Sequence, residues 1–273
     1  MLFLLLILVG IMPKTQSMSF VTQAMIGPVK SVFVERAVIS SGMIRKGERF
    51  PWYEQWWDRE GKLLKSTFFK EDGSVKNTWI YDYDSGGRRS EASVYDSDNA
   101  LRWQESYTYD SGAMLRETMI SGPNGLSTSR YHYKYDAMGR QTEVLKSVGE
   151  DDGYTTETYK YDSSARVTEN CSYGPRGQLE SKFVYQYNAK GNVKSKEDYF
   201  STGSLAHYLS YRYKYDSRGN WVEQIAFDRL GSNNPVCEVV YQSIIYFNVS
   251  HLQKDTGGMG SHQRHEKKVR ERE

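Results

Sequence analysis

Acidic side chains recur along this chain at a fixed spacing, and their type and position could do chemistry. A glutamate stands seven residues after an aspartate in most copies of a repeated Tyr-x-Tyr-Asp unit. The members of this column are Glu91, Glu117, Glu143, Glu169 and Glu223. Counting alternate residues along a strand puts the column on the same face as the tyrosines. It could form a groove for cations or sugars, or each carboxylate could bond a tyrosine hydroxyl or an arginine. We favour the second interpretation, because a position repeated in register is first a packing rule.

Other sets of reactive residues are sparse. The sequence contains no Gly-rich phosphate loop, His-Glu-x-x-His, nucleophile elbow or Cys-x-x-Cys, so we predict no enzyme, no cofactor and no metal site. The five histidines are His132, His207, His251, His262 and His265. The last three belong to a polar, charged tail that is typical of disorder rather than of metal binding. Cys171 and Cys237 lie several strands apart in the repeat, which predicts two free, half-buried thiols.

The composition fits thin, half-exposed sheet better than a thick core. Only 38% of the residues are apolar and mean hydropathy is −0.71, yet 22 of the 273 residues are tyrosines. The 36 basic and 34 acidic residues nearly cancel, so no overall charge favours nucleic acid. The alternation of Tyr and Lys around Tyr133 is therefore interpreted as a two-faced strand and not as a base-stacking surface.

Two columns of residues predict a repeated tight turn. The acidic or amide members are Asp58, Asp84, Asp110, Asp136, Asp162, Asn188 and Asp216, at intervals of 26 residues except for a last interval of 28. Three residues later stand Gly61, Gly87, Ala113, Gly139, Ala165, Gly191 and Gly219. Asp or Asn caps a type I turn with its side chain, and Gly accepts the positive φ that closes the turn. Ala113 and Ala165 should each cost about 1 kcal/mol there.

A third column halves each repeat. Fifteen residues after each turn acid stand Gly73, Asn99, Gly125, Asp151, Gly177, Gly203 and Gly231, all residue types that tolerate a left-handed conformation. Each repeat is therefore strand, turn, strand, turn, with no room for a crossover helix. The sequence predicts an all-β fold of tandem antiparallel hairpins, about fourteen to seventeen strands in one meander.

Side-chain parity divides this sheet into two faces. Tyr81 and Tyr83, and their equivalents in later repeats, share one face with the column Leu63, Leu115, Val167, Val193 and Trp221. The same count adds Phe69, Tyr95, Tyr173, Tyr199 and Phe227 to that face. Lys134, Lys160 and Lys214 take the other face. A flat sheet would leave the aromatic face wet, so we expect one long, twisted and curled sheet, an open curl or partial barrel.

The interval of 28 residues marks one irregular repeat. Gly203 keeps its place fifteen residues after Asn188, so the two extra residues should lie between Ser204 and Tyr215. Two residues preserve parity, so Tyr213 and Tyr215 should share the face of Tyr187. We expect a longer hairpin tip or a bulge between 206 and 209. His207 and Tyr208 on that tip are candidate partner contacts, although an ordinary long turn is the simpler interpretation.

The two ends of the chain differ from its middle. Residues 2–11 form an apolar run followed by a small or polar stretch, which predicts a signal peptide over 1–17, with an uncleaved membrane anchor as the alternative. Residues 18–50 are expected to add capping strands, residues 51–247 to hold the repeats, and residues 248–273 to be a disordered tail. We expect a secreted, periplasmic or cell-surface protein with no membrane span after signal cleavage.

The unit Tyr-x-Tyr-Asp-x-x-Gly-[Arg/Asn] at this period resembles the Rhs/YD-repeat family, known from bacterial surface and toxin-delivery proteins and from animal teneurins. The resemblance covers residues 51–247 with seven copies in register. In the large members the resemblance implies a hollow β-shell around a C-terminal toxin. This chain lacks the Asp-Pro-x-Gly type signature that closes such a shell, so it looks like a short, stand-alone YD-repeat protein. The function expected is a non-catalytic exported scaffold that binds a protein or a glycan. The alternative is an orphan or truncated segment of an Rhs-type toxin system, or an accessory to one.

Overall fold

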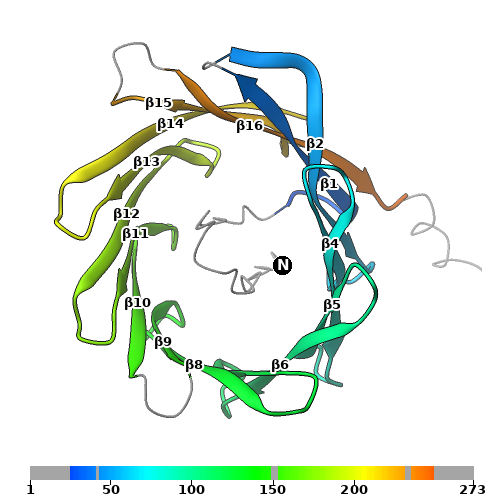
Figure 1. Cartoon of the computed structure of the whole chain (residues 1–273), viewed down its shortest axis with the longest axis vertical. Coiled ribbons are helices and arrows are strands. Elements are labelled where there is room, and N and C mark those ends of the chain that lie inside the picture. Colours follow the sequence, from blue (N-terminus) through cyan, green and yellow to red (C-terminus); the bar gives the residue numbers. More distant parts are fainter. Residues whose placement is uncertain (1–24, 41–42, 149–152, 231–234, 249–273) are drawn as a thin grey trace, which may run out of the picture.

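A computed structural model describes residues 25–40, 43–148, 153–230 and 235–248 (Figure 1). These residues form sixteen antiparallel strands. The strands are β1 (Val29–Ser40), β2 (Met43–Trp57), β3 (Leu63–Phe69), β4 (Val75–Tyr83), β5 (Arg89–Asp96), β6 (Leu101–Tyr109), β7 (Leu115–Ser121), β8 (Ser127–Tyr135), β9 (Gln141–Val148), β10 (Tyr154–Tyr161), β11 (Val167–Tyr173), β12 (Leu179–Tyr187), β13 (Val193–Tyr199), β14 (Leu205–Tyr215), β15 (Trp221–Asp228) and β16 (Val236–Tyr246). The all-β meander is confirmed.

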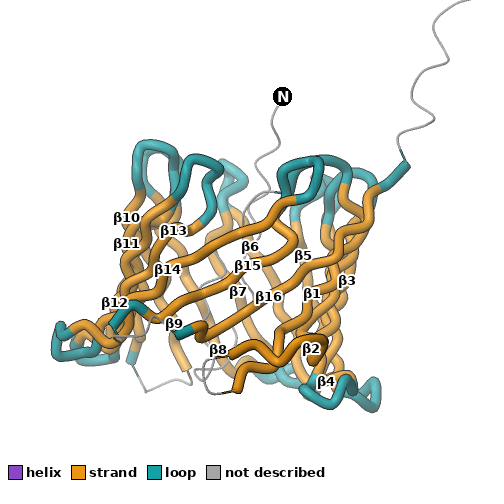
Figure 2. The backbone as a smooth tube through the Cα atoms, turned by 90° about the horizontal axis from the view of Figure 1, so that it is seen from above, coloured by secondary structure: helices purple, strands orange, loops and turns teal. Residues whose placement is uncertain are grey.

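The sheet closes into a barrel, which corrects the expectation of an open curl. Every strand pairs with its neighbours in sequence, and β1 pairs with β16, so that Val34 lies opposite Gln242. Figure 1 looks down the barrel, and Figure 2 shows the same wall from the side. The first two strands, β1 and β2, belong to the same barrel wall as the repeats. The predicted signal peptide and almost all of the predicted tail lie outside the described residues.

The turns have the predicted left-handed residues. The backbone N–H of each turn acid donates to the carbonyl of the residue four positions on, and the N–H of the third residue returns to the acid's carbonyl. Gly139 has a φ of 75°, and Ala113 and Ala165 take 62° and 58° at the same place. The turns at the opposite end of the barrel follow the same pattern at Asn99, Gly73, Gly125, Gly177 and Gly203. Asp151 and Gly231 lie outside the described residues.

A β-bulge near the start of each odd-numbered strand reverses the side-chain parity, and it corrects the predicted glutamate column. Tyr135 lies opposite Gln141, but the preceding Lys134 lies opposite Glu143, so Thr142 is the extra residue. Beyond the bulge, residues of the same parity point to the other side of the wall. The glutamates therefore share a face with the lysines and not with the tyrosines. The same shift moves Phe69, Tyr95, Tyr173, Tyr199 and Phe227 off the tyrosine face.

The tyrosine face is the inner face of the barrel. The buried clusters around Val34 and Trp57, and around Trp79 and Val94, lie on this face. Side chains converge on the concave side of a closed sheet and diverge on its convex side. On the outer side the side chains of Lys134 and Lys160 are 61% and 74% exposed. Curling around the aromatic face, as the sequence predicts, thus continues until the sheet edges meet.

β14 holds the two extra residues, but not at the predicted place. The β13–β14 hairpin keeps the usual register, with Tyr199 opposite Leu205 as Tyr173 is opposite Leu179, so there is no longer tip between 206 and 209. A bulge does lie at Ala206, as predicted, but the preceding hairpin has the same bulge at Glu180, so it does not hold the two extra residues. The strand is instead extended at its other end, so that the Asp216 turn is displaced by two residues along the wall. The parity prediction holds, because Tyr213 donates to the Val193 carbonyl as Tyr187 donates to that of Val167.

Candidate functional site

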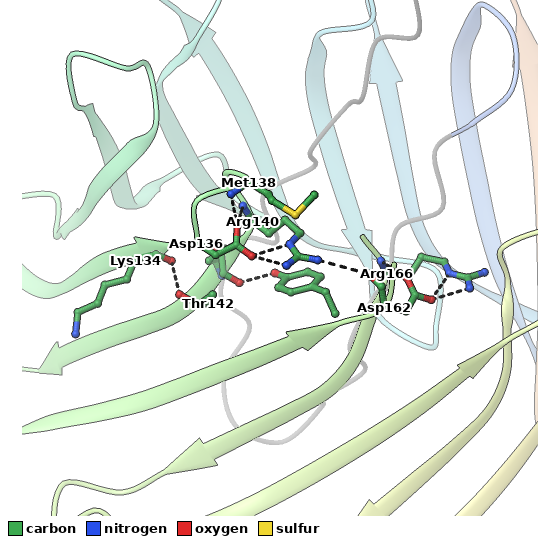
Figure 3. A network of polar contacts seen from close by, with 9 residues as sticks. Lys134, Asp136, Met138, Arg140, Thr142, Asp162 and Arg166 are labelled. Carbon is green, nitrogen blue, oxygen red and sulfur yellow. Dashed lines mark hydrogen bonds and ion pairs between the residues drawn. The ribbon is translucent and has the colours of Figure 1, made fainter. Parts of the chain in front are cut away.

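The predicted turn residues form a polar network that joins successive repeats. At Asp136, one carboxylate oxygen accepts the backbone N–H groups of Met138 and Arg140, each at 2.9 Å. The other oxygen accepts Arg140 Nε and Nη2, both at 2.7 Å. Hydrogen bonds from Arg140, backbone first, hold the pKa of Asp136 below its usual range. Figure 3 shows this pair beside the equivalent pair of Asp162 and Arg166, with Lys134 pointing away from both.

The network extends across the wall to the next tyrosine. The Arg140 guanidinium lies over the Tyr161 ring with 5.1 Å to the centroid, and Arg140 Nη1 donates to the Asp162 carbonyl at 3.4 Å. The Tyr161 hydroxyl donates to the carbonyl of Gln141, the residue after the arginine, at 2.5 Å. The turn acid, its arginine and the tyrosine therefore bind one repeat to the next.

Tyrosine-to-carbonyl bonds run round most of the barrel. Each joins a tyrosine to the carbonyl twenty residues earlier, at 2.5 to 2.8 Å: Tyr83 to Leu63, Tyr109 to Arg89, Tyr135 to Leu115, Tyr161 to Gln141, Tyr187 to Val167 and Tyr213 to Val193. At the last position Gln242 donates to the Trp221 carbonyl instead. In five repeats the donor is the second tyrosine of the motif, and in the extended strand β14 the first tyrosine, Tyr213, takes its place. These tyrosines are structural residues.

The seam between the first and last strands has a latch of its own. Asn220 is 1% exposed, and its side-chain amide bonds both backbone groups of Ile26, accepting from N–H at 2.7 Å and donating to C=O at 2.8 Å. Its Nδ2 also donates to the Tyr246 hydroxyl at 2.7 Å, which in turn donates to Asp216 at 2.5 Å. The extension of β14 displaces the turn that carries this latch toward the chain entering β1. Sequence reasoning did not identify Asn220.

The candidate contacts His207 and Tyr208 lie in the regular ladder and not on a protruding tip. His207 Nδ1 lies 3.4 Å from Asp228 Oδ2 on the adjacent strand. The Tyr208 carbonyl accepts from Arg229 N at 2.7 Å. Both residues are therefore engaged by β15 and its following turn, and the geometric reason for expecting a partner there is removed.

Three members of the glutamate column form cross-strand ion pairs with lysines on the outer wall. Glu143 lies 2.6 Å from Lys134 Nζ, Glu223 lies 2.8 Å from that of Lys214, and Glu169 lies between Lys160 and Lys182 at 2.7 and 2.8 Å. The hydrogen bond from Lys160, followed by that from Lys182, lowers the pKa of Glu169. The favoured interpretation was wrong about the partners, because these glutamates bond lysine, histidine or glutamine side chains of adjacent strands and not tyrosine hydroxyls or arginines.

A different group of residues on the inner wall combines charge with aromatic rings. This lumenal patch, as we name it, consists of Asn77 and Trp79 on β4, Arg89 on β5, and Trp103, Glu105 and Tyr107 on β6. Trp79 and Trp103 meet edge to face with centroids 5.8 Å apart. The Tyr107 hydroxyl donates to Glu105 Oε2 at 2.5 Å, and the Arg89 guanidinium lies 5.7 Å from the Tyr107 centroid.

The carboxylate of the lumenal patch is enclosed, whereas Arg89 is half-buried. Glu105 is 3% exposed, and its burial raises its pKa against the opposing hydrogen bond from Tyr107 and the charge of Arg89. Arg89 occupies the column that elsewhere holds Leu63, Leu115 or Val167. The sequence reasoning did not predict the patch, because its members do not recur in every repeat as the glutamate column does. Glu105 stands two residues before Tyr107 on an even-numbered strand, so simple parity would have placed it on the tyrosine face.

The described part of the chain has no group of metal-ligating side chains and no helix that could cross a membrane. Among residues 25–40, 43–148, 153–230 and 235–248, no three His, Cys, Asp or Glu side chains are grouped to hold a metal. The same residues contain no helix of the length and apolarity that crossing a membrane requires. The two cysteines are free, with Cys171 buried and Cys237 exposed, which corrects the expectation that both are half-buried.

Comparison with known proteins shows the fold and no family. Neither a family model nor a curated protein matches the sequence. The crystal structure of a porin-like protein from Bacteroides uniformis ATCC 8492 is similar with a TM-score of 0.53 at 11% identity, covering 81% of this chain and 98% of that one. A porin-like protein from Bacteroides vulgatus ATCC 8482 gives 0.37 at 11% identity, with 79% and 98% covered.

A weaker likeness involves a much longer chain. The crystal structure of the complex TcdB2-TccC3-Cdc42 matches with a TM-score of 0.33 at 12% identity. The match covers 77% of this chain and 14% of that chain.

Proposed function

We propose that this protein is a non-catalytic, exported repeat scaffold that binds its partner inside the barrel, at the cell envelope or surface. The observation that carries the proposal is the lumenal patch, where a buried carboxylate and a guanidinium lie among aromatic rings. The turn acids and most inner tyrosines are committed to holding the repeats together. The lumenal patch, by contrast, contains polar atoms that have no hydrogen-bond partner among the described residues. Aromatic side chains combined with a few polar groups are typical of ligand sites.

The charged side chains on the outer face of the wall support the proposal that water surrounds the barrel. Lys134, Lys160 and Lys214 project outward with side chains 61%, 74% and 72% exposed, each paired with a glutamate of the adjacent strand. A lipid-facing wall requires an apolar outer band, and charged residues in such a band are destabilising. The location at the envelope rests on the signal-like N-terminus, and the architecture shared with a porin-like protein agrees with it.

The alternative, a truncated segment of a toxin shell, is less well supported. A fragment cut from a longer spiral sheet would leave unpaired edge strands ready to continue the sheet. Here β1 and β16 pair with each other, with Ser31 opposite Ile245 and Arg36 opposite Val240. The closed sheet has no free edge among the described strands, which favours a self-contained scaffold over a segment of a larger one.

The test is location and capture in the native host. The full chain, tagged at its C-terminus, is fractionated, sequenced at its N-terminus and cross-linked in intact cells. We expect envelope or extracellular protein that starts near Met18 and carries a specific cross-linked component. Cytoplasmic protein with Met1 intact would overturn the export, and envelope protein without any specific component would overturn the scaffold role.

A further inference from the structure

Unsatisfied polar atoms gather at one place on the inner wall. Asn77 Oδ1, Trp79 Nε1 and Glu105 Oε1 are buried and have no hydrogen-bond partner in the described part of the chain. Asn77 and Trp79 are two residues apart on β4 and point to the same side. On β5, Val94 lies opposite Trp79 and Ala92 lies opposite Glu105, which brings the three groups to one area of the wall. Each such atom costs the fold stability, so the concentration of three requires an explanation.

The types of these atoms specify what would satisfy them. Asn77 Oδ1 and Glu105 Oε1 are acceptors that need donors, and Trp79 Nε1 is a donor that needs an acceptor. A hydroxyl group supplies both functions. The rings of Trp103 and Tyr107 pack beside these atoms and are only partly buried, so they offer aromatic faces for an apolar ring surface. A ligand rich in hydroxyl groups, with C–H faces between them, matches the lumenal patch.

We propose that the lumenal patch is a saccharide-binding site in which Glu105, Trp79 and Asn77 bond sugar hydroxyls while Trp103 stacks on a pyranose ring. This assignment rests on the proposed scaffold function and names its ligand class. An extended peptide fits less well, because its backbone donors and acceptors pair best with an open strand edge. The strands of this wall already pair with their neighbours, so it offers a ligand its side chains.

The barrel contains a matched control for the site. Glu157 and Tyr159 on β10 repeat the Glu-x-Tyr motif of Glu105 and Tyr107, and the Tyr159 hydroxyl donates to Glu157 Oε2 at the same 2.5 Å. Glu157, however, is exposed, and neither of its oxygens is a buried unpaired atom. Trp221 on β15 provides an indole on the same inner face outside the lumenal patch.

The experiment titrates purified mature full-length protein with maltohexaose, cellohexaose and chitohexaose, using calorimetry and tryptophan fluorescence, with hexaglycine as the peptide probe. We expect saturable binding of at least one hexasaccharide and a change in tryptophan emission. Trp79→Phe and Glu105→Gln should each weaken that binding about tenfold, the effect of one good hydrogen bond. Glu157→Gln and Trp221→Phe should stay within about twofold, the scatter expected where no contact is lost.

Three outcomes would overturn the assignment: no hexasaccharide binds, all four variants bind like the wild type, or hexaglycine binds at this site instead. Circular dichroism of each variant confirms that the barrel is folded, and Glu105→Gln leaves the side-chain shape unchanged. Failure of the scaffold function would look different. It would give cytoplasmic protein or no captured component in the native host, whatever the sugar titration shows.

Discussion

Replacing Asn220 with Ala should open the seam of the barrel. The substitution removes three hydrogen bonds at once: from Ile26 N–H at 2.7 Å, to Ile26 C=O at 2.8 Å and to the Tyr246 hydroxyl at 2.7 Å. A net contribution of about 1 kcal/mol for each bond gives a loss of about 2 to 4 kcal/mol in the free energy of unfolding. Ile26 is itself half-exposed, so water replaces part of what its backbone loses, and the lower half of that range is expected.

The matched control is Asn192→Ala. Asn192 also stands four residues after the turn residue, is 4% exposed and donates to a tyrosine hydroxyl, that of Tyr215, at 3.0 Å. It makes no bond to the chain that enters β1, so its loss should be about 1 kcal/mol. Urea unfolding followed by tryptophan fluorescence measures both. Equal losses for the two variants, within about 0.5 kcal/mol, would refute the latch, since independent sites add within that margin.

Three further predictions concern the turns, the tyrosine bonds and the buried acid. Ala165→Gly should raise the free energy of unfolding by up to about 1 kcal/mol by relieving a φ of 58°, whereas Gly139→Val should lower it by more than about 1 kcal/mol; urea midpoints moving the other way would contradict the turn assignment. Tyr161→Phe should cost about 1 kcal/mol through loss of the bond to the Gln141 carbonyl, and a variant as stable as the wild type in thermal unfolding would show that the bond is idle. Glu105→Gln should stabilise the protein at pH 7, because burial raises the pKa of Glu105 above its unfolded value and the wild type loses stability as the pH rises through the folded pKa. That advantage should vanish below about pH 4, where the acid is neutral in both states, and urea midpoints that diverge further on acidification would contradict it.

The regular repeat allowed the local structure, the turns and the strand faces, to be predicted from the sequence. Asp136 and Gly139, with their equivalents in the other repeats, fix where each hairpin turns, because the cap and the left-handed residue act within five residues of chain. The parity of the even-numbered strands followed in the same way, as Tyr133 and Tyr135 show. These features depend on neighbours in the chain and needed no tertiary information.

The bulge defeated the same reasoning on the odd-numbered strands. A simple count from the turn places Glu143 with the tyrosines, but one extra residue at Thr142 turns it toward Lys134 on the outer wall. The bulge arises from the pairing of two strands, which no count along one strand can reveal. The two extra residues of β14 were misplaced for a related reason, since register with β13 and β15 decided which end of the strand would extend.

Closure and the lumenal patch belong to the tertiary structure alone. The sequence determined a curled meander with an aromatic face, but the join of β1 to β16 arises from twist accumulated over sixteen strands. The contact between Asn220 and Ile26 at this join links residues 194 apart, which no repeat pattern predicts. In the sequence nothing connects Trp79, Arg89 and Glu105, because Arg89 departs from an apolar column and Glu105 shares its place with Glu157 of a later repeat. They form one patch because consecutive repeats supply adjacent strands of the barrel, and the concave inner face of the wall brings their side chains together.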